Sequence, residues 1–187
     1  MPTEAFYKLS VDRQEEILDA AARQFAEHGY RAASTNRIVR ELGIAKGSLF
    51  YYFDGKEDLY LHILESSRQA FMAAIDRRVV DLPPDLLVRL RIVTEIGLDL
   101  LIANPVRFRV YMRLSEDLTS DVHRRYFARL QQEALPTMER WFGDVDMSRF
   151  RNDAETTFRL IGWLYAGMKL EMRTLVDEST DPQGVKQ

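Results

Sequence analysis

Residues 34–53, STNRIVRELGIAKGSLFYYF, contain two short helical patterns separated by a glycine, and this stretch restricts the fold more than any other. Ser34 or Thr35 can cap the first helix, which is expected to end at Gly43, a residue that adopts positive φ at little cost. The second helix is expected over Lys46–Tyr52. Two helices joined by a turn of about three or four residues that contains glycine form a helix-turn-helix, whose second helix can enter the major groove of DNA.

A longer helix is predicted before this pair. Apolar side chains recur every three and four residues after Ser10 or Asp12, either of which can start the helix, and Gly29 is the expected stop. The three helices together form a small N-terminal domain, which we place at residues 1–55. The periodicity is helical almost throughout the chain, so the predicted fold class is all-α.

The formal net charge of −3 is unevenly distributed along the chain. Residues 31–56 hold five basic and two acidic side chains, a net charge of +3, which leaves −6 for the remaining residues. An acidic protein with one basic segment is attracted to polyanions through that segment. A solvated charged face is the alternative interpretation of the charges alone. The side chains concerned are Arg31, Arg37, Arg40, Glu41, Lys46, Asp54 and Lys56.

Small and polar residues at the start of the second short helix favour contact with DNA bases. Lys46, Gly47 and Ser48 let the N-terminus of this helix press against base edges, whereas apolar residues there would have indicated a core. Thr35 and Asn36 begin the preceding helix, where free N–H groups and the positive end of the helix dipole favour a phosphate.

The aromatic residues that follow have two interpretations. Tyr51 and Tyr52 can place their hydroxyl groups on the sugar-phosphate backbone or pack against the domain, and both alternatives remain open. Phe50 and Phe53 are expected to pack inside the small domain. Lys56, at the start of the next predicted helix, adds a positive charge within reach of DNA.

Gly29-Tyr30, Ser34-Thr35 and the segment IVRELGIAKGSLFYYFDGKEDLY together are similar to the N-terminal signature of the TetR family of bacterial transcriptional regulators. The similarity covers about residues 10 to 62. It implies an all-helical homodimer that usually represses transcription and releases DNA when a small molecule binds its larger C-terminal domain. By position, the resemblance implies DNA contacts at Thr35, Asn36, Lys46, Gly47, Ser48, Tyr52 and Lys56.

Two positions depart from the family pattern. The family usually has tyrosine at the position of Phe50, where its hydroxyl meets a phosphate, and Lys46 or Tyr51 can compensate for the missing bond. Val39 stands where the family has alanine, so it adds volume where the two short helices cross. Neither change alters the predicted class of protein.

A larger helical domain is predicted over residues 56–187, and by resemblance it binds the effector and forms the dimer. The dipeptide Pro83-Pro84 interrupts the periodicity, and Asp85 can cap the helix that follows. Pro136 is expected to kink a later helix. The helices expected in this domain span 56–80, 85–103, a short segment from 105, 120–142 and 151–176.

A pocket for a small hydrophobic or aromatic effector is predicted inside this domain, which is rich in aromatic residues and methionine. Thr94 lies in an apolar row of its helix, so its hydroxyl is expected to bond either a main-chain carbonyl or a ligand. The other candidates either line the pocket or fill the core. The expected lining is Phe71, Thr94, Leu98, Phe108, Tyr111, Met112, Phe127, Met138, Trp141, Trp163 and Tyr165.

Three arginines close to Pro105 also have two interpretations. Arg107, Arg109 and Arg113 can bind an anionic effector or form ion pairs on the surface, where Glu116 is a candidate partner, and the surface interpretation is favoured. His123 is expected to be a residue of the core or its rim rather than a ligand.

The last predicted helix has two apolar rows, so it must be covered on two sides, by its own subunit and by a second copy. In the TetR family the last two helices of each subunit form a four-helix dimer bundle. Here either the predicted helix 120–142 serves as the second member or the chain stops before a final helix. The expected dimer interface is Phe158, Ile161, Tyr165, Met168 and Met172.

The chain has no cysteine, which excludes disulfides, thiolate zinc sites and a cysteine nucleophile. The histidines show no metal-ligand spacing and no phosphate loop is present, so we predict no enzyme, no cofactor and no metal site. The longest uncharged apolar run, Ile161–Met168, is too short to span a membrane, and the N-terminus does not resemble a signal peptide. We therefore expect a soluble cytoplasmic protein.

Three classes of function follow from these patterns. The leading prediction is a homodimeric repressor that binds a palindromic operator in double-stranded DNA and is released by a small molecule. The second is a regulator of the same fold that binds DNA without a small molecule. The third is an enzyme or a carrier of hydrophobic molecules in which the helix-turn-helix has lost its role.

Overall fold

The computed structural model describes residues 1–79, 82–114, 120–148, 150–151, 153–164 and 167. Every regular element in these ranges is an α-helix, which confirms the predicted all-α fold class. The helices are α1 (Glu4–Tyr7), α2 (Val11–Ala32), α3 (Thr35–Glu41), α4 (Lys46–Tyr52), α5 (Gly55–Val79), α6 (Leu86–Ala103), α7 (Pro105–Arg113) and α8 (Asp121–Phe142), followed by a helix over 154–164.

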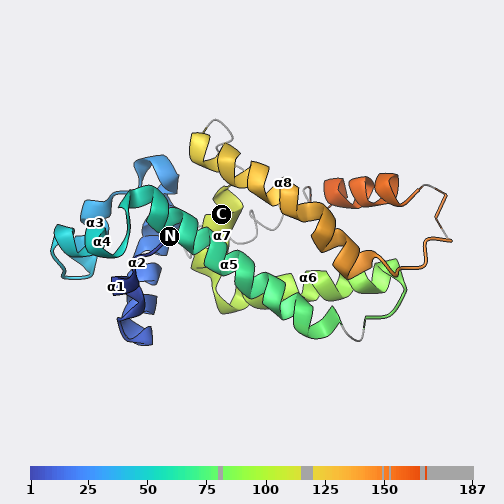
Figure 1. Ribbon diagram of the computed structural model, residues 1–187, viewed down its shortest axis with the longest axis horizontal. Coiled ribbons are helices and arrows are strands. Elements are labelled where there is room, and N and C mark those ends of the chain that lie inside the picture. Colours follow the sequence, from blue (N-terminus) through green and yellow to red (C-terminus); the bar gives the residue numbers. More distant parts are fainter. Residues whose placement is uncertain (80–81, 115–119, 149, 152, 165–166, 168–187) are drawn as a thin grey trace, which may run out of the picture.

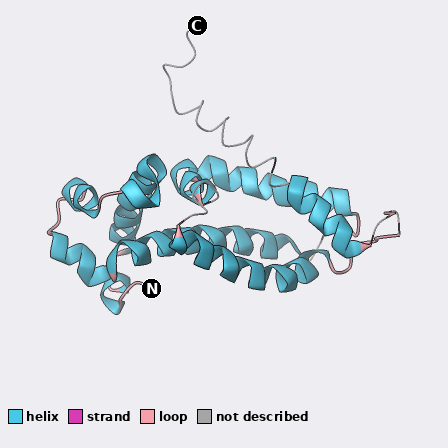
Figure 2. Ribbon diagram, turned by 90° about the horizontal axis from the view of Figure 1, so that it is seen from above, coloured by secondary structure: helices cyan, strands magenta, loops and turns pink. Residues whose placement is uncertain are grey.

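The molecule has a small head and an elongated body. Helices α1–α4 form the head at one end, and α5 leaves the head and runs along the body beside α6 (Figure 1). Seen from above, α8 and the helices beneath it lie lengthwise in the body (Figure 2). None of the helices in the described ranges is long and apolar enough to cross a membrane.

Helix α2 is interrupted where glycine was predicted to stop it. The Ser10 side chain accepts a hydrogen bond from the Arg13 N–H at 3.3 Å and so caps the start of the helix. Gly29 has a φ of 69°, which kinks the helix before its last turn at Ala32. The predicted start at Ser10 is confirmed, and the predicted stop at Gly29 is a kink.

A short helix at the N-terminus, α1, was not predicted. Thr3 donates from its N–H to the main-chain oxygen of Tyr52 at 2.9 Å and from its hydroxyl to the main-chain oxygen of Tyr51 at 2.8 Å. Phe6 is fully buried, with its ring centroid 4.9 Å from that of Phe53. The N-terminal segment therefore satisfies carbonyl groups at the C-terminal end of α4 and closes the core of the head.

The first hydrophobic core joins the head to the body. Its buried side chains come from α1–α4, from the first turns of α5, and from α7 and α8. The helices on both sides of the predicted domain boundary at residue 55 therefore share one core. Its largest fully buried members are Phe6, Ile17, Phe25, Ile38, Leu49, Phe53, Leu59, Tyr60, Ile63 and Leu64.

A second core lies between α5, α6, α8 and the helix over 154–164, around Ile75, Leu86 and Trp141. Asp85 accepts hydrogen bonds from the N–H groups of the second and third residues of α6 at 2.9 and 3.0 Å, which confirms the predicted cap. The bounds of α6 agree with the predicted helix 85–103.

Arg89 ties the start of α6 to the end of α8, although it is almost completely buried. Its guanidinium forms an ion pair with Asp144, with N–O distances of 2.6 and 2.8 Å. It also donates to the main-chain oxygens of Trp141, Leu82 and Pro83. The Arg89 hydrogen bonds lower the pKa of the Asp144 carboxyl below its usual value.

Candidate nucleic-acid interface

The turn between α3 and α4 has the geometry that the sequence predicts. Gly43 has a φ of 64° and donates to the Arg40 oxygen at 3.2 Å, while Ile44 donates to the Val39 oxygen at 3.0 Å. These two bonds form a Schellman motif, which closes α3 and redirects the chain into α4. The predicted helix-turn-helix is therefore present, with the predicted bounds for α4.

Helix α4 has one buried side and one open side. Leu49 and Phe53 are buried and fix the helix on the core of the head. Lys46 and Gly47 are exposed and Ser48 is half-buried in the first turn. A Cβ atom built on Gly47 meets no atom within 4 Å, so this turn presents an unobstructed surface.

The aromatic residues of α4 differ in their surroundings. Phe50 is 43% exposed, so the expectation that it packs inside the head is wrong. It lies on the open side, and the Lys46 ammonium is 5.8 Å from the centroid of its ring. Tyr51 is 67% exposed, whereas Tyr52 packs against Phe6 with the ring centroids 6.4 Å apart.

The head exposes several positive side chains of the basic segment. Arg31, Arg37 and Arg40 are exposed. Glu41, one of the two acidic residues in the segment, forms an ion pair with Arg23 at 2.6 Å, so its charge is compensated from α2. Thr35 is half-buried and Asn36 is exposed at the start of α3, in the same head as α4.

Lys56 has a structural role that the sequence did not predict. Its ammonium donates to the main-chain oxygens of Arg31 and Ala33 at 3.0 and 3.3 Å, and it lies 4.9 Å from the centroid of the Tyr30 ring. A lysine ammonium has three N–H donors. These contacts therefore leave Lys56 one donor for a phosphate.

Helix α7 connects the head with the body, and Arg107 forms ion pairs as the favoured interpretation expects, but with partners on α2. Arg107 pairs with Glu15 at 2.5 Å and with Asp19 at 2.8 Å, both on α2. Arg113 donates to the main-chain oxygens of Ala26 and Glu27, next to the kink in α2. Two of the three arginines thus hold α2 instead of pairing along α7. Glu116 lies outside the described residues.

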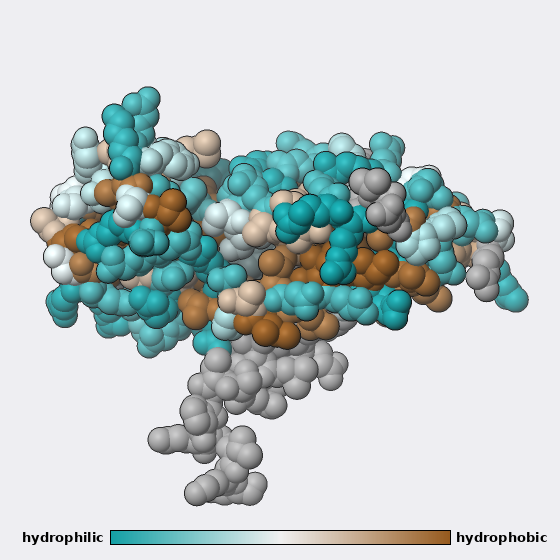
Figure 3. Space-filling model, turned by 90° about the horizontal axis from the view of Figure 1, so that it is seen from below, coloured by the Kyte–Doolittle hydropathy of each residue, from teal (hydrophilic) through white to brown (hydrophobic). Residues whose placement is uncertain are grey.

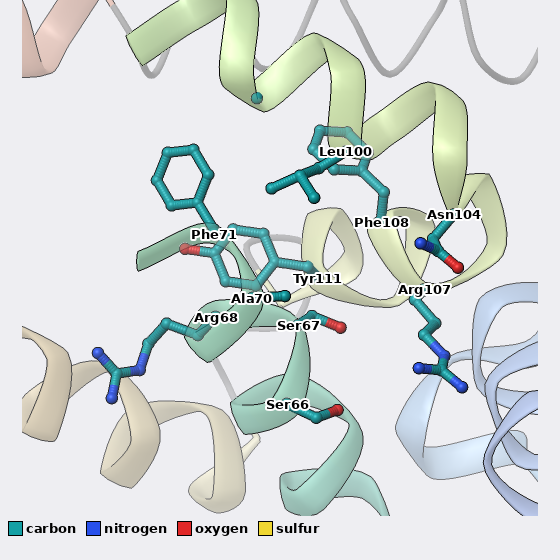
Figure 4. Close-up of a pocket in the computed structure, with 11 residues that line it drawn as sticks. Ser66, Ser67, Arg68, Ala70, Phe71, Leu100, Asn104, Arg107, Phe108 and Tyr111 are labelled. Carbon is teal, nitrogen blue, oxygen red and sulfur yellow. The ribbon is translucent and has the colours of Figure 1, made fainter. Parts of the chain in front are cut away.

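A cavity of about 180 Å³ lies in the body between α5, α6 and α7. Phe71, Phe108 and Tyr111 of the predicted pocket are found on its wall, and Figure 4 shows them grouped with Leu100. Apart from Arg107, the sequence did not indicate the polar part of the lining. This part consists of Ser66, Ser67, Arg68, Asn104 and Arg107.

The other predicted pocket residues whose side chains are described do not line this cavity. The Thr94 hydroxyl donates to the Leu90 oxygen at 2.7 Å, the main-chain alternative of the prediction. Leu98 and Trp163 are exposed, the latter to 65%, because they lie on outer faces of their helices. Phe127 packs on the first core, and buried Trp141 belongs to the second core and donates to Asp76. Met112, Met138 and Tyr165 lie outside the residues whose side chains are described.

The helix over 154–164 places its apolar rows differently from the prediction. Phe158 and Ile161 pack against the second core, so these two predicted interface residues face their own subunit. Leu160, Trp163 and Leu164 form an exposed apolar row. On the face drawn in Figure 3, the largest apolar area lies on the body and smaller ones lie on the head. The other predicted interface residues, Tyr165, Met168 and Met172, lie outside the described residues.

A buried and a half-buried histidine lie where the head joins the body. His123 is buried and its Nε2 is 3.0 Å from the Tyr60 hydroxyl, which confirms the predicted core position. His62 packs edge-on against Phe6 with the ring centroids 5.7 Å apart. Burial lowers the pKa of His62 below its usual value, and the positive charge of Arg107 lowers it further against the opposing effect of nearby carboxylates.

Comparison with known proteins agrees with this geometry. A family model described as bacterial regulatory proteins, tetR family, matches residues 17–63, which cover most of the head and the start of α5. The HTH-type transcriptional repressor AcnR of Corynebacterium diphtheriae is 37% identical over 89 residues. This match covers 46% of this chain and 46% of the repressor, so it spans less than half the length of that relative.

Solved structures match over nearly the whole length. A TetR family transcriptional regulator from Chloroflexus aurantiacus J-10-FL covers 97% of this chain and 95% of its own, with 23% identity and a TM-score of 0.56. A putative transcriptional regulator from Pseudomonas aeruginosa PAO1 covers 96% of this chain and 85% of its own, with 19% identity and a TM-score of 0.67. At these identities the matches show a shared fold, in which a body of the same kind follows the head.

Proposed function

Because the chain belongs to the TetR family of bacterial regulatory proteins, we propose that it is a sequence-specific DNA-binding regulator of transcription. The observation that carries this proposal is that α4 has one side buried in the core and one side exposed. Leu49 and Phe53 fix the helix on the core, while Lys46 and Gly47 stay exposed in its first turn. Such a helix can enter the major groove with its N-terminus against base edges.

The proposed contacts divide into those that read bases and those that hold the backbone. Lys46, Gly47 and Ser48 meet base edges. The remaining contacts go to phosphates and sugars, which position the protein without carrying sequence information. These contacts come from Thr35, Asn36, Tyr51, Tyr52 and the remaining donor of Lys56.

The proposed regulator acts as a homodimer on a palindromic operator. One recognition helix reads only a few base pairs, and a two-fold axis doubles the contacts and places the half-sites about one helical turn apart. The row of Leu160, Trp163 and Leu164 supports a dimer surface, because three large apolar side chains lie exposed on one helix. This surface replaces the predicted one around Phe158 and Ile161.

The proposed regulator represses transcription until a small effector binds in the cavity. The wall formed by Phe71, Leu100, Phe108 and Tyr111 suits an apolar or aromatic molecule. Helix α7 lines the cavity and holds α2, so a ligand that shifts α7 changes the placement of the head. A family composed of transcriptional regulators supports a role without catalysis, and the proposed site of action is the cytoplasm.

Equilibrium DNA binding at several salt concentrations tests this proposal. Replacing Lys46 with alanine should weaken binding and reduce the slope of log affinity against log salt by about 0.9, the value for one positive charge removed from the contact with DNA. Arg91→Ala is the matched control, because Arg91 is exposed on the body. If both variants bind DNA with the same slope, α4 is not the contact surface.

A further inference from the structure

Arg107 belongs to the wall of the cavity and to the joint between head and body at the same time. Its side chain lines the cavity, while its guanidinium pairs with Glu15 and Asp19 on α2. Figure 4 shows the guanidinium turned out of the cavity, toward the neighbouring helix. One side chain therefore connects the space for a ligand with the helix that carries the head.

The charged side chains of the lining are cationic, so an acid group is the ligand group that can compete for them. The two charged residues of the lining are both arginines, Arg68 and Arg107. Arg68 is neutralised by Glu65 at 2.7 Å and Glu133 at 3.0 Å. The Nη1 group of Arg107 donates to no atom of the described residues, whereas its Nη2 and Nε groups hold α2. An acid group in the cavity can therefore accept from Arg107 when the guanidinium turns inward, in competition with Glu15 and Asp19.

The rest of the lining selects for an apolar remainder. Phe71, Leu100, Phe108 and Tyr111 form its largest surfaces, and Figure 4 shows these side chains together on the side of the cavity away from Arg107. The hydroxyl groups of Ser66 and Ser67 donate to a main-chain oxygen of their own helix. A ligand that fits this division has one acid group at one end and a hydrocarbon body.

We propose, on the basis of the proposed function, that the effector is an apolar carboxylic acid that draws Arg107 away from Glu15 and Asp19. The side chains of these two carboxylates are about half exposed, at 51% and 50%, so water and salt weaken their pairs with Arg107. A carboxylate inside the cavity is screened less and competes for the same guanidinium. Loss of the pairs removes the ion pairs between α2 and α7, leaving the shared core and the Arg113 contacts, and so changes the placement of the head.

Arg113 provides a natural control for this proposal. It also reaches from α7 to α2, through the main-chain oxygens of Ala26 and Glu27, but it does not line the cavity. Any effect that arises from loosening α2 alone should therefore appear in an Arg113 variant. An effect that depends on a carboxylate in the cavity should appear only when Arg107 is changed.

Calorimetric titration of the full chain with octanoate and with 1-octanol tests the proposal without DNA. The two probes share a hydrocarbon chain and differ in the acid group. Arg107→Gln should weaken octanoate binding about tenfold, the loss of a charged hydrogen bond, and leave 1-octanol binding unchanged. Arg113→Gln should leave the ratio of the two affinities as it is in the wild type.

The double variant E15Q/D19N shows whether Glu15 and Asp19 compete with the ligand for Arg107. It removes the competing carboxylates, so it should bind octanoate more tightly than the wild type, by up to about fivefold. Amide hydrogen exchange gives a second measurement, because octanoate should speed exchange in α2 of the wild type and 1-octanol should not.

Three results would overturn the proposal. The first is the absence of saturable octanoate binding by the wild type. The second is that R107Q binds each probe as tightly as the wild type does. The third is an octanoate affinity in E15Q/D19N no higher than in the wild type. Because no DNA is present in these experiments, they fail or succeed independently of the proposed regulatory function. A protein that binds DNA but fails them is a regulator with a different effector.

Discussion

The ammonium group of Lys56 lies 3.0 Å from the main-chain oxygen of Arg31, and this contact joins the start of α5 to the end of α2. The Ala33 oxygen accepts a second hydrogen bond from the same group, and the face of Tyr30 lies beneath it. Carbonyl groups at the end of a helix have no partner within the helix. Lys56 therefore stabilises the head even in the absence of DNA.

Replacing Lys56 with methionine should destabilise the protein by about 1–3 kcal/mol, because the variant keeps the apolar stem but loses charged hydrogen bonds to carbonyl groups. Urea denaturation measures the change in the free energy of unfolding. Lys46→Met is the matched control, since the Lys46 side chain is exposed, and it should unfold like the wild type. Equal stability of the two variants would show that the Lys56 contacts contribute nothing.

Two glycines of the helix-turn-helix should respond to alanine in opposite ways. Gly47→Ala should stabilise the fold by about 0.5–1 kcal/mol, because the position is helical and open, yet weaken operator binding roughly tenfold by separating α4 from the bases. Gly43→Ala should destabilise the fold by about 1–2 kcal/mol, because its φ is 64°. Thermal unfolding and DNA titration of both variants distinguish the two effects. Wild-type DNA affinity in Gly47→Ala would argue against close approach at that residue.

Replacing Trp163 with glutamate should raise the dissociation constant of the dimer about 100-fold, because large aromatic residues carry much of the binding energy of interfaces. Analytical ultracentrifugation measures the change. Ile102→Glu is the control, since Ile102 is an exposed apolar residue of α6 and lies outside the proposed surface. A variant at Trp163 that remains as dimeric as the control would remove the 154–164 helix from the interface.

Mild acid should destabilise the joint between head and body through His62. Burial lowers the pKa of His62 in the folded protein, whereas the unfolded chain binds the proton with a pKa of about 6.5. Between these two values the unfolded state holds more protons, so the free energy of unfolding falls as the pH drops below about 6.5. His62→Gln should reduce the loss of stability between pH 7.5 and 5.5, measured by urea denaturation. An unchanged loss in this variant would assign the effect to other groups.

Much of the helical framework could be predicted because its information is local in the sequence. The cap at Asp85, the positive φ of Gly43 and the bounds of α4 each depend on residues a few positions apart. Helix α1 could not be predicted in this way, since a helix of 4 residues is too short to show a period. The contacts of Phe6 that hold it in place come from distant parts of the chain.

The candidate site was only partly predictable, for the same physical reason. The exposure of Lys46 and Gly47 follows from the pattern of α4, but Arg107 finds its carboxylate partners on α2, about 90 positions earlier in the chain. Both rows of the last helix are apolar, so composition alone could not decide whether Phe158 or Trp163 faces outward. Phe158 faces inward because it packs against Phe142, with the two ring centroids 5.6 Å apart.

The central claim, that α4 of a dimer reads DNA sequence, is tested most directly by selecting from a random library of duplex DNA with the purified protein at near-physiological salt. Sequencing of the retained duplexes should yield one enriched palindrome with half-sites about one helical turn apart. The Lys46→Ala variant should fail to enrich it. Retention of unrelated sequences by a folded protein would contradict the claim, because a head that binds only through its charge has no sequence preference.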